Sequence, residues 1–140
     1  MRVLGIDHGD RRIGLAISDP GGLIASGLPT LEVKGGTEQV VEALRRVCQE
    51  QAVERIVVGL PINMDGSQGP RAQISLEFAQ QLRDALGLEV ETWDERLTSV
   101  QADRAMLQGD LSRKKRKQRV DRLAAQLLLQ SYLDAKGRKL

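Results

Sequence analysis

One short apolar run, Arg55–Leu60, limits the fold of this chain more than any other feature. Its sequence is RIVVGL, in which large aliphatic residues follow one another without alternation. A strand of this kind is buried on both faces, as in a parallel sheet that helices cover from both sides. Helical spacing of apolar residues precedes the run at 37–48 and follows it at 71–86. The pattern therefore predicts an α/β fold.

Residues 1–33 show the pattern of antiparallel strands instead. An aliphatic run at 3–6 leads into the polar, glycine-containing turn HGDRR, and large and small residues then alternate over 13–18. Two such runs joined by a short turn predict a hairpin. A third strand is expected over 24–33, at an edge of the sheet because Pro29 interrupts it.

The remaining elements complete a mixed sheet. We expect a helix that Thr37 caps, a second helix that Gly87 ends, a strand over 88–93, a short helix over 98–108, a polar basic stretch over 109–118 and a last helix over 119–135. The early strands are antiparallel and the later ones parallel, with helices on both faces. The length of 140 residues predicts a single domain spanning 1–140.

Composition excludes several kinds of site. Aromatic residues make up 2% of the chain, so the core is aliphatic and a stacking platform for bases is nearly excluded. Cys48 and His8 are the single cysteine and histidine, which rules out internal disulfides and zinc sites built on thiolates or several imidazoles. Phosphate-loop, dinucleotide-binding and serine-elbow motifs are missing. No apolar run could span a membrane and no leader precedes the first strand, so we expect a cytoplasmic protein that binds no membrane.

Acidic residues stand where the predicted strands and the last helix end or begin. Asp7 ends the first strand, Asp94 and Glu95 end the strand over 88–93, and Asp121 lies near the start of the last helix, beside its apolar stripe. Sites in open α/β sheets form at the carboxyl ends of strands, so these acids can meet despite their separation in sequence. Three converging carboxylates repel one another unless a cation joins them.

Oxygen ligands of this kind favour Mg²⁺ or Mn²⁺, and such an ion suits phosphoryl displacement. Asp10 is a possible fourth ligand, although capping its own turn is the more ordinary role. The other acids also have alternatives: Asp7 as a turn residue, Glu95 paired with Arg96, and Asp121 as a partner of the helix dipole.

Charge is distributed unevenly along the chain. Residues 1–110 carry a net charge of −6 and residues 111–140 one of +8. The basic residues concentrate just before Asp121, where the sequence reads SRKKRKQR. Such a run can be the solvated end of a helix. It can also serve an enzyme that neutralises backbone phosphates beside a metal site. The candidate phosphate-binding residues are Arg113, Lys114, Lys115, Arg116, Lys117 and Arg119.

Four segments, in order, resemble the motif blocks of the YqgF family over the whole chain: GIDHGDRRIGLAISDP, VVGLPINMDGSQGPRA, TWDERLTS and VDRLAAQLLLQSYLD. Members are bacterial RNase H-like proteins, described as Holliday junction resolvase homologues and pre-16S rRNA processing nucleases. The resemblance implies the RNase H-like fold, a five-stranded mixed sheet with strands 1–3 antiparallel.

The resemblance also implies roles for individual residues. The acids of the family fall on Asp7, Glu95 and Asp121, which would be catalytic and hold the metal. Arg96 would reach a phosphate. The family's loop residues fall on Asn63, Asp65 and Gly66, in an auxiliary role. Junction resolvases carry a second acid one turn after the helix acid, where this chain has Ala124.

These observations predict a nuclease acting on structured nucleic acid, with Mg²⁺ or Mn²⁺ as cofactor. The leading expectation is processing of the 5′ end of pre-16S rRNA during ribosome biogenesis. The alternatives are a junction-resolving DNA endonuclease, which needs a two-fold symmetric dimer, and a non-catalytic nucleic-acid-binding protein. The sequence leaves a monomer and a homodimer both open.

Overall fold

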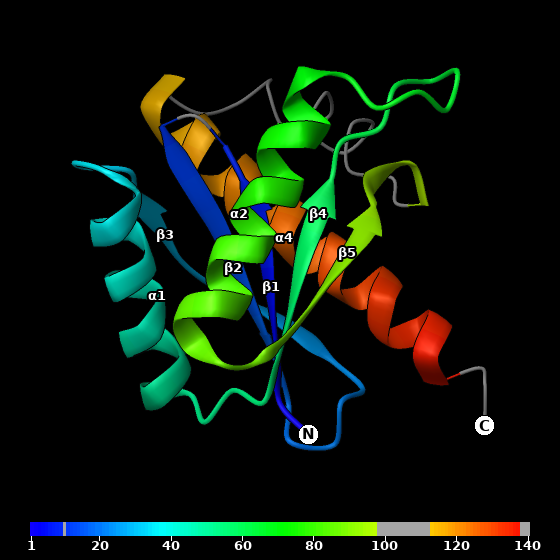
Figure 1. The fold of residues 1–140 in the computed structure, drawn as a ribbon. Coiled ribbons are helices and arrows are strands. Elements are labelled where there is room, and N and C mark those ends of the chain that lie inside the picture. Colours follow the sequence, from blue (N-terminus) through cyan, green and yellow to red (C-terminus); the bar gives the residue numbers. More distant parts are fainter. Residues whose placement is uncertain (10, 98–112, 138–140) are drawn as a thin grey trace.

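The computed structural model describes residues 1–9, 11–97 and 113–137, with the backbone alone over 113–120. Figure 1 shows the arrangement of its elements. In chain order they are β1 (Val3–His8), β2 (Arg12–Ser18), β3 (Ala25–Glu32), α1 (Thr37–Glu50), β4 (Arg55–Leu60), α2 (Pro70–Leu86), β5 (Glu89–Asp94), the 3₁₀ turn η1 (Glu95–Leu97) and α4 (Arg113–Gly137).

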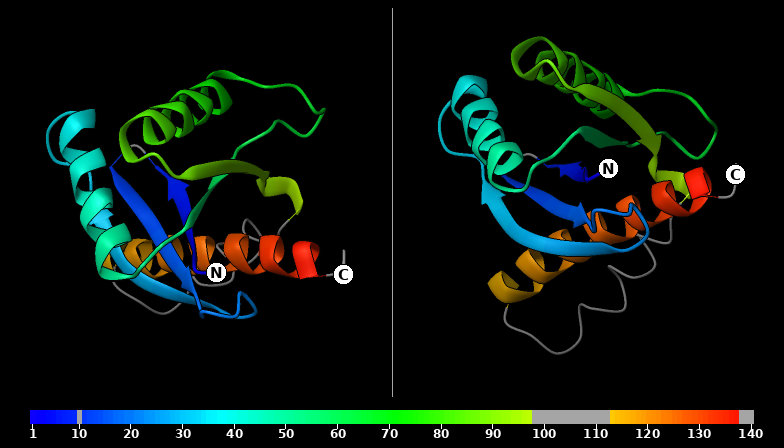
Figure 2. Two further views of the ribbon diagram at one scale, coloured as in Figure 1. Left: turned by 60° about the horizontal axis from the view of Figure 1, so that its bottom comes forward. Right: turned by 90° about the horizontal axis from the view of Figure 1, so that it is seen from below.

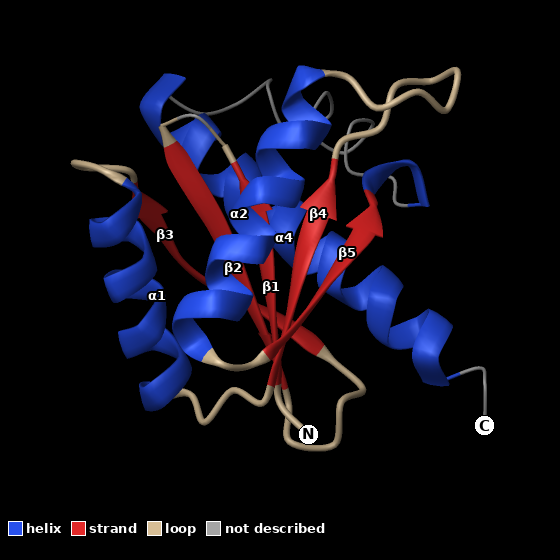
Figure 3. Cartoon of the chain, viewed as in Figure 1, coloured by secondary structure: helices blue, strands red, loops and turns tan. Residues whose placement is uncertain are grey.

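The strands form one five-stranded sheet in the order β3-β2-β1-β4-β5. The pairs β1–β2 and β2–β3 are antiparallel, whereas β1–β4 and β4–β5 are parallel. This confirms the mixed sheet expected from the sequence. It also confirms the edge position of β3, where the missing N–H of Pro29 is tolerated. The parallel strands β1, β4 and β5 all end at the same side of the sheet, uppermost in Figure 3.

Helices cover both faces of the sheet, as expected. Helices α1 and α2 lie on one face and α4 crosses the other (Figure 2). Alternate residues of β4 supply both layers, since Val58 packs with α1 and α2 while Val57 packs with α4. Both valines are fully buried, which confirms the interpretation of the apolar run.

His8 and Asp7 occupy opposite faces of the sheet. The His8 ring stacks on Phe78 of α2, with centroids 4.2 Å apart. Successive strand residues point to opposite faces, so Asp7 belongs to the face that α4 covers. The backbone at Gly5 supports this, because a Cβ there would lie 2.8 Å from Cβ of Leu129 in α4.

Two predicted helix starts were wrong. Helix α1 is capped by Gly36 instead of Thr37, and the Gly36 N–H donates to Oε1 of Gln39. Helix α4 begins at Arg113, six positions before the predicted start, because arginine, lysine and glutamine favour helical backbone even without apolar spacing. Gly87 ends α2 in the left-handed conformation (φ +67°), as expected. The helix expected over 98–108 lies outside the described residues.

Cys48 is a buried side chain of α1, and burial raises the pKa of its thiol to about 11. At pH 8 the thiolate that attacks disulfide reagents is therefore scarce, and the sulfur is also shielded. We expect the folded protein to react with a chromogenic disulfide at least ~100-fold more slowly than the denatured chain. Comparable rates for the two states would contradict this placement.

None of the helices in the described part of the chain combines the length and apolar character needed to cross a membrane.

Candidate active site

Asp7 lies near the carboxyl end of β1, the central strand of the sheet. Its two neighbours across the strands are glycines. Gly14 of β2 is directly opposite Asp7, and Gly59 of β4 follows the last registered pair, Ile6 with Val58. Neighbouring strands are about 4.8 Å apart, so both glycines flank the carboxylate at close range.

Each glycine makes room for one of the other two acids. A Cβ on Gly14 would lie 2.3 Å from the carbonyl oxygen of Asp121, so α4 crosses β2 at Asp121 with backbone almost against backbone. A Cβ on Gly59 would lie 2.7 Å from Oε1 of Glu95. The fold therefore brings Asp121 to one side of Asp7 and Glu95 to the other.

The carboxylate of Asp121 has a partner of its own. Nε of Arg12 donates to Oδ2 of Asp121 at 2.9 Å, and both side chains are about three-quarters buried (22% and 24% exposed). Arg12 stands two residues before Gly14 on β2 and hence on the same face of the sheet. The guanidinium of Arg12 thus lies at the acidic end of the sheet, and the sequence analysis did not predict it there.

The acidic side chains suit a divalent ion in their chemistry. Carboxylate oxygens are the ligands that Mg²⁺ and Mn²⁺ prefer, and the close approaches at Gly14 and Gly59 bring Asp121 and Glu95 toward Asp7. Among the described residues, the structure contains no group of three or more Asp, Glu, His or Cys side chains close enough to hold one metal ion. A carboxylate offers about four lone-pair sites, so Asp121 can serve an ion while its Oδ2 accepts the hydrogen bond from Arg12. Asp10 lies outside the described residues.

The basic segment begins α4. Helix α4 starts at the end of the sheet where β1, β4 and β5 terminate and runs toward the opposite end (Figure 1). Its backbone places 113–119 between about half a turn and about two turns before Asp121 on the same helix. The basic residues therefore precede the candidate site along one rigid element, and their contact with nucleic acid stays a prediction.

Arg96, the other candidate phosphate ligand, is already engaged within the protein. Its Nη2 donates to Oδ2 of Asp94 at 2.8 Å and its Nε donates to both carboxylate oxygens, at 3.2 and 3.1 Å. Its Nη1 lies 3.5 Å from the carbonyl oxygen of Asn63. Arg96 thus pairs with Asp94, not with Glu95 as the alternative interpretation had it, and joins β5 to the loop after β4.

The loop after β4 is held by its own polar side chains. Oδ1 of Asp65 accepts hydrogen bonds from the Ser67 hydroxyl (2.6 Å) and the Ser67 N–H (2.9 Å). Asn63 exchanges backbone hydrogen bonds with Ser67 and Gly66, and Gly66 has a positive φ of +88°. The bonds from Ser67, its hydroxyl first, lower the pKa of Asp65. In the described structure Asn63 and Asp65 shape the loop.

We expect an Asp94→Asn variant to loosen this loop. The hydrogen bonds from Arg96 lower the pKa of Asp94 below its ordinary 3.8, so the stabilisation is present above pH ~4 and is lost as the pH falls through the lowered pKa. Amide exchange at Gly66 and Ser67 should accelerate about fivefold, which corresponds to ~1 kcal/mol for a partly exposed ion pair (38% and 20% exposed). Glu42→Gln, which breaks the Arg45 pair on α1, is the control and should leave these amides unchanged.

Sequence reasoning missed Arg12, Gly14 and Gly59 as parts of this site, and it named Asp94 as an acid at a strand end without its pairing to Arg96. The glycines carried a signal, because an isolated glycine inside a strand pattern marks close approach of another backbone or group. Arg12 carried none, since nothing local shows which partner a charged residue meets across the fold.

Comparison with known proteins agrees with this geometry. A family model described as "RuvX: Holliday junction resolvase" matches residues 1–135. The chain belongs to the RuvX family. This is the YqgF family of the sequence resemblance, which is thereby confirmed.

A relative from Pelotomaculum thermopropionicum is 49% identical over 99% of this chain and 90% of its own. A relative from Clostridium botulinum (strain Alaska E43 / Type E3) is 50% identical over 96% of this chain and 97% of its own. Both are provisionally named pre-16S rRNA nucleases.

Solved structures show the same fold for the RuvX chain. Thermus thermophilus RuvC superposes with a TM-score of 0.60 and 17% identity, over 99% of this chain and 97% of that one. RuvC in the T. thermophilus complex with a Holliday junction substrate superposes with a TM-score of 0.58 and 18% identity, over 98% of this chain and 96% of that one. The RNase H-like fold expected from the resemblance is thus confirmed.

Proposed function

We propose that this protein is a divalent-metal-dependent nuclease that processes the 5′ end of pre-16S rRNA in the cytoplasm. The observation that carries the proposal is the position of Asp7 between two glycines, one beneath Asp121 and the other beneath Glu95. Membership in the RuvX family and the names of its relatives support phosphodiester hydrolysis on a ribosomal RNA precursor.

Asp7, Glu95 and Asp121 would hold Mg²⁺ or Mn²⁺ at this end of the sheet. When bound, such an ion supplies positive charge that stabilises the phosphoryl group during displacement and lowers the pKa of water. Asp7 comes from a central strand and Asp121 from a helix packed on it, so both carboxylates are held on rigid elements. The basic residues 113–119 at the start of α4 neutralise phosphates on either side of the cleaved bond.

A junction-resolving DNA endonuclease is the second candidate, favoured by the description of the family. Symmetric cleavage of a four-way junction requires two copies related by a two-fold axis. The two candidates therefore differ in substrate and in oligomeric state.

Cleavage assays separate these functions. The protein is incubated with a labelled 16S rRNA precursor and with a labelled four-way DNA junction, in Mg²⁺, in Mn²⁺ and in chelator, and its mass is measured by light scattering. We expect metal-dependent cleavage of the RNA. Paired cuts in the junction by a dimer would favour the resolvase, and no cleavage of either substrate would leave the non-catalytic alternative.

A further inference from the structure

Arg12 is only partly used by the protein. Its Nε donates to Oδ2 of Asp121, and within the described residues its side chain makes no further hydrogen bond or ion pair. Arginine carries five N–H donors arranged in a planar fork. The four donors on the two Nη atoms are therefore available, and the side chain reaches solvent (22% exposed).

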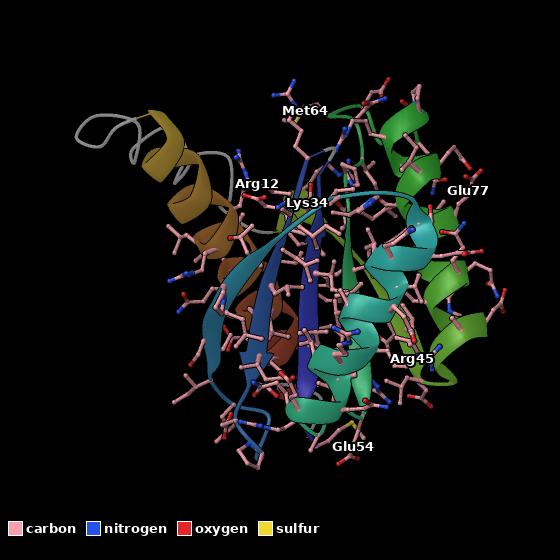
Figure 4. The ribbon with its side chains drawn as sticks, turned by 90° about the vertical axis from the view of Figure 1, so that its left-hand side faces the viewer. Arg12, Lys34, Arg45, Glu54, Met64 and Glu77 are labelled. Carbon is pink, nitrogen blue, oxygen red and sulfur yellow. The ribbon has the colours of Figure 1, made fainter. Side chains whose placement is uncertain are left out.

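The position of Arg12 places these donors at the candidate active site. It lies on the same face of β2 as Gly14, the residue opposite Asp7. Figure 4 shows Arg12 at the end of the sheet where Met64 of the loop after β4 also lies, with Glu54 at the other end. A guanidinium held here is bonded to Asp121 and lies on the same face of the sheet as Asp7, where a phosphodiester would have to approach for cleavage.

Charge gives this guanidinium a role. Asp7, Glu95 and Asp121 place negative charge at this end of the sheet, and each approaching phosphate adds more. Arginine can pair with two anions at once, because its planar fork offers separate donor-bearing edges. Arg96 has fewer uncommitted donors than Arg12, since its Nε and Nη2 donate to Asp94 and its Nη1 lies 3.5 Å from the carbonyl oxygen of Asn63.

We propose that Arg12 is the phosphate-binding residue of the active site. Anchored on Asp121 through Nε, it presents its Nη groups to the phosphodiester that is cut or to the phosphate next to it. The same contact aligns the substrate with helix α4, because Asp121 belongs to that helix. This inference rests on the proposed nuclease function and names the residue that positions its substrate.

The test compares Arg12→Gln with Arg11→Gln. Both variants lose one positive charge from adjacent positions, but Arg11 is exposed. Binding of a labelled 16S rRNA precursor fragment and of a labelled DNA junction is measured by fluorescence anisotropy in chelator, across a series of salt concentrations. Steady-state cleavage is measured in Mg²⁺ and Mn²⁺, and thermal unfolding monitors the fold.

For Arg12→Gln we expect about tenfold weaker binding and a salt dependence shallower by ~0.7–0.9 in log–log slope, the loss of one phosphate contact. We also expect a fall in kcat/KM of about 100-fold. Arg11→Gln should change binding less than threefold and leave the slope unaltered. Arg12→Lys should keep the slope of the salt dependence, because the lysine ammonium still contacts a phosphate. Its kcat/KM should fall at least about tenfold, because lysine lacks the planar donor fork of arginine.

Equal affinities and equal salt-dependence slopes for the two glutamine variants would overturn the inference. Cleavage by the wild-type protein would then show that the nuclease function stands without it. Conversely, Arg12→Gln alone could weaken binding of the nucleic acid while the wild-type protein cleaves neither substrate. That result would uphold the phosphate site and reject the nuclease function. If Arg12→Gln unfolds, Arg12→Lys decides, and wild-type behaviour of that variant in every measurement would overturn the inference.

Discussion

An Asp7→Asn variant is expected to fold normally and to lose cleavage activity by on the order of 10³-fold. Asparagine keeps the size of the side chain but removes the negative charge that a divalent ion requires at the centre of the site. Glu95→Gln and Asp121→Asn should show losses of similar order, because all three carboxylates would hold the same ion. Cleavage of labelled 16S rRNA precursor, with thermal unfolding beside it, measures the effect.

The control for this series is Asp84→Asn. Asp84 lies on α2, where its carboxylate accepts a hydrogen bond from Gln80, on the face of the sheet away from α4. Removal of this charge should leave the cleavage rate within about twofold of wild type. Normal cleavage by the three active-site variants would refute the catalytic assignment, even though the fold would stand.

A Gly14→Ala variant is expected to lose both stability and activity. The added methyl group would meet the carbonyl oxygen of Asp121 at 2.3 Å, and that oxygen belongs to the backbone of a helix and cannot turn aside. Helix α4 must move off the sheet, at a cost of about 3 kcal/mol in unfolding free energy. Denaturant unfolding measures the cost. Gly137→Ala at the end of α4, where a methyl group meets nothing, should be neutral.

Gly59→Ala provides the complementary test. Its methyl group would meet side-chain atoms, Oε1 of Glu95 at 2.7 Å and Cδ2 of Leu128 at 2.9 Å. Side chains can shift where a helix backbone cannot, so we expect less than about half the stability loss of Gly14→Ala. Displacement of Glu95 should still remove most of the activity. Full activity would mean that Glu95 need not occupy the space above Gly59.

Local patterns predicted much of the fold. The apolar run of β4 has no polar face, so it had to be buried on both sides, and Pro29 had to lie at an edge because it cannot donate a ladder hydrogen bond. Helix α4 was predicted too short, since its first two turns are polar and helical propensity without an apolar stripe is a weak signal. Thr37 suited a cap chemically, but the chain turns into α1 one residue earlier.

The candidate site was predicted in part for a similar reason. Asp7 lies near the end of β1 and Glu95 directly follows β5, and the carboxyl ends of parallel strands must lie together at one edge of the sheet. The partner of Arg96 was not predicted correctly, because Asp94 and Glu95 are both within reach along the chain and only the turn of η1 selects Asp94.

By itself, the sequence determined the mixed α/β sheet, the burial of β4 and the carboxylates at the ends of strands, because each follows from the periodicity and chemistry of neighbouring residues. Only the tertiary structure decided that α4 crosses β2 at Gly14 and that Arg12 binds Asp121, 109 positions along the chain. Such contacts depend on how closely a helix backbone can approach a strand and on where a long side chain ends in space. Neither quantity is encoded by residues that are adjacent in sequence.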